Sequence, residues 1–138
     1  SITKYNAGEN NTLNCLQQLK NKGYRIVATT PHKNDCTIAE LDVTKPFALV
    51  FGTEIDGISQ EVFDVADEFV KIPMYGFTES FNISVSAALY MYELTTRIRE
   101  QKIPYNISEN EKQEIYVEWL KASISKSDLI VKEFYNKK

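Results

Sequence analysis

The sequence predicts an α/β protein built on a parallel sheet. Segments with the pattern of helices alternate along the chain with short apolar segments typical of buried strands, which is the order found in parallel α/β folds. Two of these apolar segments, 47–51 and 68–72, run into polar loops that contain glycines. Because open α/β sheets bind their ligands at the carboxyl ends of adjacent strands, these loops also predict a binding crevice.

The first part of the chain supplies one helix and three strands. We expect a helix capped by Asn11 and ended by Gly23, with its leucines on one face. Residues 24–28 form a buried strand that opens into the polar loop 29–35. The second strand, 47–51, comes directly after a proline, and 68–72 forms the third.

Three further helices are expected. Ser59 caps a short helix before the third strand, and a longer helix runs from about residue 82 to residue 102. Ser108 and Glu111 make a capping box that starts a last helical pattern. That pattern continues through a set of spaced apolar residues, Tyr116, Leu120, Ile124, Val131 and Tyr135.

Composition sets the class of protein. At 138 residues, with 43% hydrophobic and 25% charged residues, the chain is an ordinary globular domain, and it lacks an apolar run long enough to span a membrane. Its two cysteines do not form a metal-binding pattern. The net charge is −3, but residues 94–138 carry nine Lys/Arg and seven Asp/Glu. We therefore expect contacts with phosphates to come from the C-terminal part, or from a segment outside this sequence.

The predicted crevice carries polar residues with a definite chemistry. Gly52 follows an apolar run, where a missing side chain lets a ligand approach the backbone. Glu54 follows at the same strand end and is a functional acid, a solvated loop acid or a cap for a helix N-terminus. Ser80 and Asn82 stand in the first turn of the long helix, where free backbone N–H groups point outward. Ser80 could equally be an ordinary cap.

The loops do not match a phosphate-binding motif. The sequence contains neither GxGxxG nor GxxxxGK[ST], and we expect no lysine or arginine in the crevice to neutralise a pyrophosphate. A neutral-to-acidic crevice made of backbone suits a ligand with an adenosine group and no phosphate. S-adenosylmethionine fits that description.

Three segments, residues 28–32, 51–59 and 72–88, together resemble the SpoU/TrmH branch of the SPOUT RNA 2′-O-ribose methyltransferases. Residues 72–88, IPMYGFTESFNISVSAA, are similar to its IPM…S-hydrophobic-N-x-S element. Residues 51–59, FGTEIDGIS, resemble its G-x-E-x-x-G-[IVL]-S element, and residues 28–32 resemble its upstream loop. The resemblance is collinear over roughly residues 11–100.

The resemblance implies a parallel-sheet α/β fold with a deep trefoil knot, S-adenosylmethionine as cofactor and methyl transfer to a ribose 2′-hydroxyl of RNA, without a metal. It places five residues at the cofactor: Thr29, Gly52, Ile72, Met74 and Phe81. It places three at the reacting centre: Glu54, Ser80 and Asn82. Phe81 departs from the leucine that is commoner there. The resemblance also implies a homodimer. Apart from the resemblance, we expect a cytoplasmic protein that does not bind a membrane, because Cys15 and Cys36 fit reduced cytosolic thiols and the chain lacks an apolar run of membrane length.

One departure concerns the first motif of the family, an N-terminal segment with an asparagine and an arginine. Residues 1–10 do not match it, and Arg25 and Arg97 do not replace the arginine by position. We expect an N-terminally truncated domain that is inactive alone. The alternatives are a catalytically degenerate RNA-binding or scaffold protein and, outside the family, an unrelated α/β enzyme such as a nucleotide hydrolase.

We expect two domains, a partial cofactor-binding methyltransferase domain at 1–103 and a helical extension at 104–138. Such an extension resembles the one in tRNA guanosine-2′-O-methyltransferases, which favours tRNA as substrate over ribosomal RNA. Its lysines either contact phosphates or form a solvated face interleaved with glutamates. We expect Tyr116 and Trp119 to pack rather than to stack on bases, and His32 to be a loop residue rather than a base catalyst.

Overall fold

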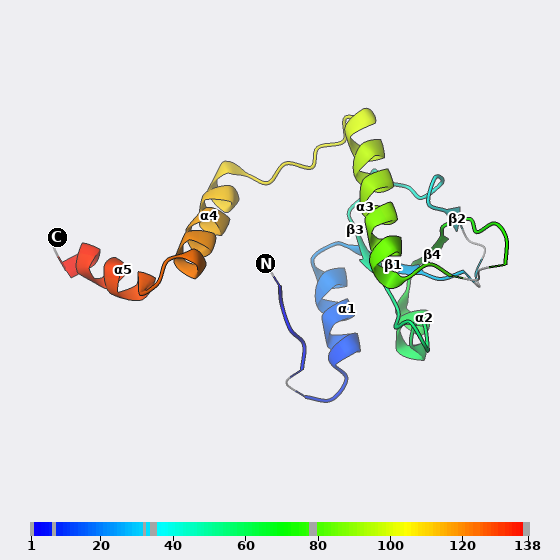
Figure 1. Ribbon diagram of the computed structural model, residues 1–138, viewed down its shortest axis with the longest axis horizontal. Coiled ribbons are helices and arrows are strands. Elements are labelled where there is room, and N and C mark those ends of the chain that lie inside the picture. The colour runs from blue at the N-terminus through cyan, green and yellow to red at the C-terminus, as the bar shows by residue number, and fades with distance from the viewer. Residues whose placement is uncertain (1, 7, 32, 34–35, 78–79, 137–138) are drawn as a thin grey trace. The chain divides into compact units, whose positions relative to one another are not determined.

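The computed structural model describes residues 2–6, 8–31, 33, 36–77 and 80–136. The chain divides into two compact units, Ser1–Ile103 and Pro104–Lys138. The first unit holds a four-stranded parallel sheet with helices on both of its faces (Figure 1). The predicted parallel α/β fold is therefore confirmed.

Four strands make the sheet, in the order β2-β4-β1-β3. They are β1 (Arg25–Thr29), β2 (Cys36–Thr37), β3 (Phe47–Val50) and β4 (Glu68–Lys71). The expectation that the second and third predicted strands are neighbours is wrong, because β1 lies between them and pairs with both. β1 is buried at its three middle residues, and a strand apolar on both faces is stable only inside a sheet. β2 was not predicted, since two residues carry no periodic signal.

The strands direct alternate side chains to two cores. One face is covered by α1 (Asn11–Asn21) and α2 (Gln60–Val65), and the other by α3 (Ile83–Glu100). The first core contains Leu16, Ile26, Ala28, Val62 and Phe69. The second core contains Val27, Leu41, Val43, Val70, Tyr90 and Leu94. Ile26 and Val27 point to opposite faces because side chains alternate along a strand.

The start of α1 differs from the prediction by one residue. Asn10 is the N-cap, in the left-handed region at φ 59°, where asparagine is tolerated better than most residues. The Asn11 side chain instead donates a 2.8 Å hydrogen bond to the carbonyl of Gly8. Gly23, at φ 85°, follows the end of the helix, as predicted.

Two arginines tie elements of the first unit together. Arg25 on β1 donates a 2.6 Å hydrogen bond to the Glu68 carboxylate on β4. Arg97 on α3 donates bonds of 2.7 and 2.8 Å to the carbonyls of Ile38 and Leu41. Both guanidinium groups are engaged in structural contacts. That neither replaces the arginine of the first motif stays a prediction.

The second unit consists of α4 (Glu109–Ser123) and α5 (Ser127–Asn136). The hydroxyl of Ser108 accepts a hydrogen bond from the backbone N–H of Glu111 at 3.2 Å, which confirms the predicted N-cap. The expectation of one continuous helical pattern is wrong. The chain turns between the two helices, where Lys126 adopts φ 59°, a left-handed conformation that a helix interior cannot contain.

The second unit has no buried residue in either helix among the residues that the structure describes. Trp119 is 64% exposed and Tyr116 is 62% exposed, so neither packs as predicted. The other large apolar side chains exposed on these helices are Val117, Leu120, Leu129, Ile130, Phe134 and Tyr135. In 2–6, 8–31, 33, 36–77 and 80–136, no helix is long and apolar enough to cross a bilayer.

Candidate functional site

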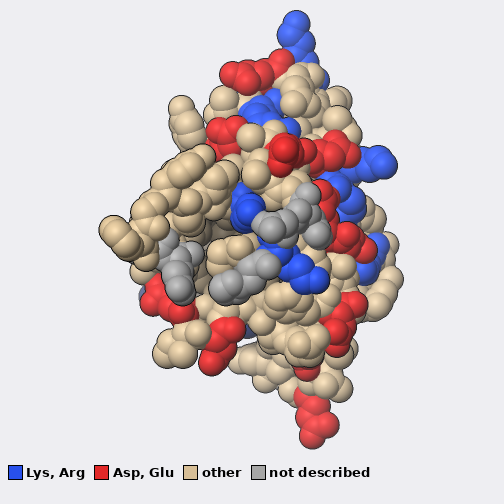
Figure 2. All heavy atoms as spheres, turned by 90° about the vertical axis from the view of Figure 1, so that its right-hand side faces the viewer, with Lys and Arg blue, Asp and Glu red and all other residues tan. Residues whose placement is uncertain are grey.

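A cavity of about 570 Å³ opens in the first unit, at the edge where the parallel strands end. Its walls come from the loops after β1, β3 and β4, from the start of α3 and from one residue of α2. This volume lies in the range of roughly 300–1,000 Å³ typical of small-molecule sites. The face seen in Figure 2 is hollowed near its centre, with both basic and acidic side chains around the hollow.

All eight residues predicted for the cofactor and the reacting centre line this cavity. They are Thr29, Gly52, Glu54, Ile72, Met74, Ser80, Phe81 and Asn82. They come from three loops that are far apart in the sequence and meet because parallel strands end at one edge. Their individual roles stay predictions.

The structure explains the glycine at position 52 by a different cause from the predicted approach of a ligand. A Cβ at this position would lie 2.1 Å from the carbonyl carbon of Gly57 and 2.4 Å from the nitrogen of Ile58. Side-chain atoms cannot occupy such distances to backbone. The glycine is therefore required by the return of its own loop, whether or not a ligand also approaches it.

The loop after Gly52 is closed by its own hydrogen bonds. The N–H of Thr53 donates to the carbonyl of Gly57 at 2.8 Å, and the N–H of Gly57 donates back to the carbonyl of Thr53 at 3.1 Å. Gly57 turns the chain at φ 68°. The hydroxyl of Thr53 also accepts from the N–H of Asp56 at 3.0 Å. Glu54 therefore projects from a small, cross-braced turn.

Glu54 and Asn82 are in direct contact across the cavity wall. The amide Nδ2 of Asn82 donates a hydrogen bond of 2.6 Å to Oε1 of Glu54. The other end of the same amide, Oδ1, accepts from the backbone N–H of Ser84 at 2.9 Å, so Asn82 is the N-cap of α3. This cap satisfies one of the orphan donors that every helix start exposes.

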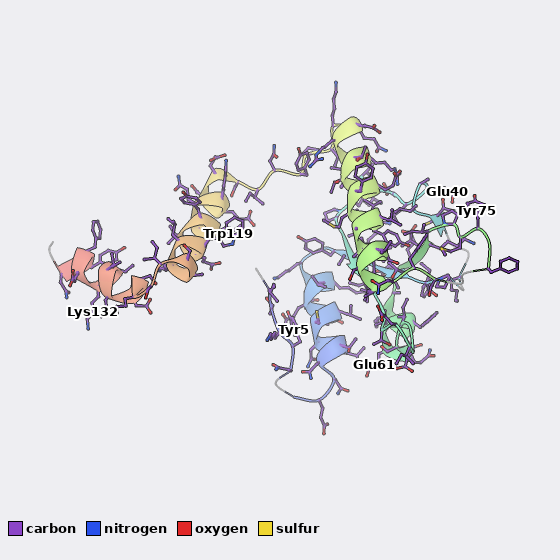
Figure 3. All side chains as sticks on the ribbon, in the orientation of Figure 1. Tyr5, Glu40, Glu61, Tyr75, Trp119 and Lys132 are labelled. Carbon is purple, nitrogen blue, oxygen red and sulfur yellow. The ribbon has the colours of Figure 1, made fainter. Side chains whose placement is uncertain are left out.

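Ser80 and Phe81 precede the helix. The prediction that Ser80 lies in the first turn of the helix is wrong, because α3 begins at Ile83 and Asn82 takes the capping position. Ser80 is exposed in the loop, and Phe81 is 40% exposed at the cavity. Tyr75, labelled in Figure 3, lies on the same loop between β4 and α3 and is 89% exposed.

Tyr90 is a cavity residue that the sequence analysis missed. Its ring is 2% exposed, its hydroxyl donates to the carbonyl of Val70 at 3.1 Å, and it meets the Phe51 ring edge-on at 5.7 Å. Burial, and then the nearby Cys36 thiol, raises the pKa of Tyr90 above its ordinary value. The sequence did contain a signal that Tyr90 lies near the site. Tyr90 stands eight residues, about two helical turns, after Asn82, so the two lie on the same side of the helix.

Lys71 also lines the cavity, so the expectation of a crevice without lysine or arginine is wrong. The residue ends β4, where the pattern of the strand gives no sign that its side chain reaches the cavity. Lys71 contributes to a lowered pKa of the Glu40 carboxyl, after the stronger hydrogen bonds from Thr37. Glu54 and Asp56 bring two carboxylates to the same cavity, which therefore carries charges of both signs.

Some sequence predictions fall outside this geometry. His32 lies outside the described residues, as do two lysines of the C-terminal extension that were candidates for phosphate contacts, Lys137 and Lys138. Phe63 of α2 lines the cavity without a signal in the sequence that could have shown it. Among the residues that the structure describes, there is no cluster of three His, Cys, Asp or Glu side chains that could hold a metal ion.

The fold and the cavity define a class of α/β proteins that bind a small ligand at the carboxyl edge of a parallel sheet. Residues 3–92 match the SpoU rRNA methylase family, and the chain belongs to that family. The match includes all three loops around the cavity.

Individual relatives agree with this family. The chain is 40% identical over 115 residues to the tRNA (guanosine(18)-2′-O)-methyltransferase of Borreliella burgdorferi, covering 83% of this chain and 53% of the relative. It is 41% identical over 112 residues to the same-named enzyme of Aquifex aeolicus, covering 79% and 53%. The chain therefore spans about half the length of the curated relatives it matches.

Solved structures show the same similarity. The A. aeolicus TrmH/SpoU tRNA modifying enzyme superposes with a TM-score of 0.72 at 36% identity, covering 82% of this chain and 59% of that one. The SpoU methyltransferase AviRb from Streptomyces viridochromogenes, solved with AdoMet, gives a TM-score of 0.56 at 28% identity, covering 67% and 37%.

Proposed function

We propose that the protein to which this chain belongs methylates a ribose 2′-hydroxyl of RNA, with S-adenosylmethionine as methyl donor and tRNA guanosine as the favoured target. The observation that carries the proposal is the meeting of three family loops around one cavity of ligand size. The names of the relatives, which are tRNA (guanosine(18)-2′-O)-methyltransferases, support tRNA over ribosomal RNA.

The cavity residues fit an adenosine ligand that carries a positive sulfonium. The ladder between β1 and β3 ends at the pair Ala28–Val50, so the backbone of Gly52 lies beyond it and is available to an adenine. Ile72, Met74 and Phe81 add apolar surface. The carboxylates of Glu54 and Asp56 give the cavity an attraction for a cation.

In the proposed reaction, the cofactor provides the reactive group and residues of the chain position the substrate. S-adenosylmethionine supplies a methyl group that is electrophilic without a metal. Ser80 and Asn82 hold the ribose hydroxyl in line with that group, because proximity and alignment alone remove much of such a barrier. A base must also take the hydroxyl proton. Among the described lining residues there is no arginine, so the arginine of the first motif does not come from this cavity wall.

The second candidate is a catalytically degenerate RNA-binding protein. It is favoured by the engagement of Arg25 and Arg97 in structural contacts, which leaves the described part of the cavity without the arginine of the family. In that case the cavity would still bind S-adenosylmethionine. We also propose a cytoplasmic location.

Two measurements test the proposed function. Titration calorimetry is expected to show S-adenosylmethionine binding to the intact protein, and radiolabelled methyl groups are expected in tRNA at a ribose. A deletion strain should lack one 2′-O-methyl mark. Binding without transfer to tRNA or ribosomal RNA would favour the degenerate protein, and absence of binding would contradict both candidates.

We further propose a homodimer formed through α3. Ala88, Leu89, Met91 and Tyr92 are exposed on this helix, with Met91 at 60% and Tyr92 at 73%. Tyr90 and Leu94, on the other side of α3, are buried against the sheet. A twofold interface would cover the exposed apolar face with its own copy.

Ala88→Arg is expected to convert this dimer to a monomer, because it would bury an unpaired charge in the interface. Light scattering of the intact protein at micromolar concentration measures the mass. Glu100→Arg, at the exposed C-terminal end of α3, is the matched control and should leave the dimer intact. A wild-type monomer would overturn the dimer, and a folded, dimeric Ala88→Arg variant would place the interface elsewhere.

A further inference from the structure

We propose that Glu54 is a positioning residue that acts through Asn82, rather than a group that takes part in the methyl transfer itself. Its carboxylate holds the Asn82 amide in one orientation and joins the loop after β3 to the start of α3. The inference deepens the proposed function and rests on it for the identity of the ligand.

The orientation of the Asn82 amide is fixed from both ends. Oδ1 accepts from the N–H of Ser84, and Nδ2 donates to Glu54. A flipped amide would place Nδ2 against the N–H of Ser84 and its oxygen against a carboxylate. Both contacts would be repulsive, because an amide nitrogen only donates and a carboxylate only accepts. Without Glu54, one of these two constraints disappears.

The bond joins two braced parts of the fold that are 28 residues apart in the sequence. On one side, Glu54 stands on the turn closed by Thr53 and Gly57. On the other side, Asn82 caps the 18-residue helix α3. Both residues line the cavity, so the bond fixes the spacing of two cavity walls before a ligand arrives. A site held in its binding geometry loses less free energy on binding than one that must be ordered.

The bond also selects which atoms remain for the ligand. It uses one of the two hydrogens on Nδ2 of Asn82 and one of the two carboxylate oxygens of Glu54. The amide keeps a donor for a ribose oxygen at the start of the helix. At 2.6 Å the contact is short, as expected for a hydrogen bond to a charged acceptor, which is stronger than one between neutral groups.

The role of Glu54 can be separated from base catalysis by two substitutions. Glu54→Gln keeps an oxygen that accepts from Asn82 but loses the charge, whereas Glu54→Ala loses the bond. If Glu54 positions Asn82, Glu54→Gln should weaken S-adenosylmethionine binding and lower turnover about threefold, and Glu54→Ala should do so at least tenfold. If Glu54 is the base, both variants should lose turnover equally, and that result would overturn the proposal.

A swapped pair provides a second, stricter test. Asn82→Asp keeps the helix cap but sets two carboxylates against each other, which is tolerated only when they share a proton. The melting temperature of this variant without cofactor should fall by roughly 4 °C or more as pH rises from about 5 to 8, because both carboxylates are then charged. The double variant Glu54→Gln with Asn82→Asp restores a donor opposite a carboxylate, and its melting temperature should recover and change over that range only as that of the wild type does. The other ionisable lining residues among those described, Asp56, Lys71 and Tyr90, are the same in both proteins.

Thermal unfolding tests the link without a cofactor. In a double-mutant cycle, Glu54→Ala and Asn82→Ala should each lower the melting temperature, by roughly 4 °C, and the double variant should lose clearly less than the sum. Asp56→Ala, which removes a neighbouring acid, should combine additively with Asn82→Ala. Additive losses for Glu54 and Asn82 would show that the link is absent. Absence of S-adenosylmethionine binding by a wild-type protein that shows the coupling would reject the proposed ligand and retain the link.

Discussion

Gly52→Ala is expected to weaken S-adenosylmethionine binding at least tenfold, which corresponds to about 1.4 kcal/mol. The added Cβ would lie 2.1–2.4 Å from backbone atoms of Gly57 and Ile58. Backbone cannot move aside as a flexible side chain can, so the turn must open and its hydrogen bonds between Thr53 and Gly57 must break. Glu54 would move with the turn. Titration calorimetry of the folded variant measures the loss.

Gly8→Ala is the matched control for this substitution. A Cβ at Gly8 would meet nothing within 4 Å, so the same chemical change should leave cofactor affinity as in the wild type. Wild-type affinity in a folded Gly52→Ala protein would show that the closed turn is not needed for binding. It would also mean that the close approach of the Gly57 backbone does not make a glycine necessary at position 52.

Tyr90→Ala is expected to destabilise the first unit by roughly 3–5 kcal/mol, as for other large aromatic truncations in a core. The ring is 2% exposed and belongs to the core between α3 and the sheet. Because Tyr90 also forms part of the cavity wall, the loss of the ring would open the wall beside Phe51. Denaturant unfolding followed by circular dichroism measures the free energy of unfolding.

Tyr90→Phe separates the ring from its hydroxyl. It should cost only about 0.5–1.5 kcal/mol, the usual net value of one hydrogen bond. The loss stays small because the carbonyl of Val70 also accepts from the N–H of Thr30 at 3.1 Å and is not left unsatisfied. Equal losses in the two variants would mean that the hydroxyl, and not the packing of the ring, stabilises this core.

Patterns of local sequence predicted most elements of the first unit. The apolar runs around Val27, Leu49 and Val70 are β1, β3 and β4, within a residue or two. The cap residues Ser59 and Ser108 also stand where the pattern put them. Such features are local, since apolar periodicity and capping depend on residues only a few positions apart.

Strand order and the short strand β2 could not be read from these patterns. β1 pairs with both β3 and β4, and Cys36–Thr37 pairs with β4, and all of these contacts join residues that are far apart in the sequence. The break between α4 and α5 was also not predicted, because the apolar residues keep a helical spacing on both sides of the turn at Lys126.

By itself, the sequence determined the α/β class and the three loops, because glycines, caps and polar loop residues carry their own local requirements. Its resemblance to the SpoU/TrmH family, and not local pattern alone, supplied the eight predicted residues that line the cavity. Only the tertiary structure decided what these residues touch. Gly52 proved to be required by the backbone of Gly57, and Lys71 and Tyr90 joined the cavity from a strand end and a helix face. The hydrogen bond from Asn82 to Glu54 joins residues that are 28 positions apart in the sequence. They come into contact only because the folded sheet brings the ends of its strands to one edge.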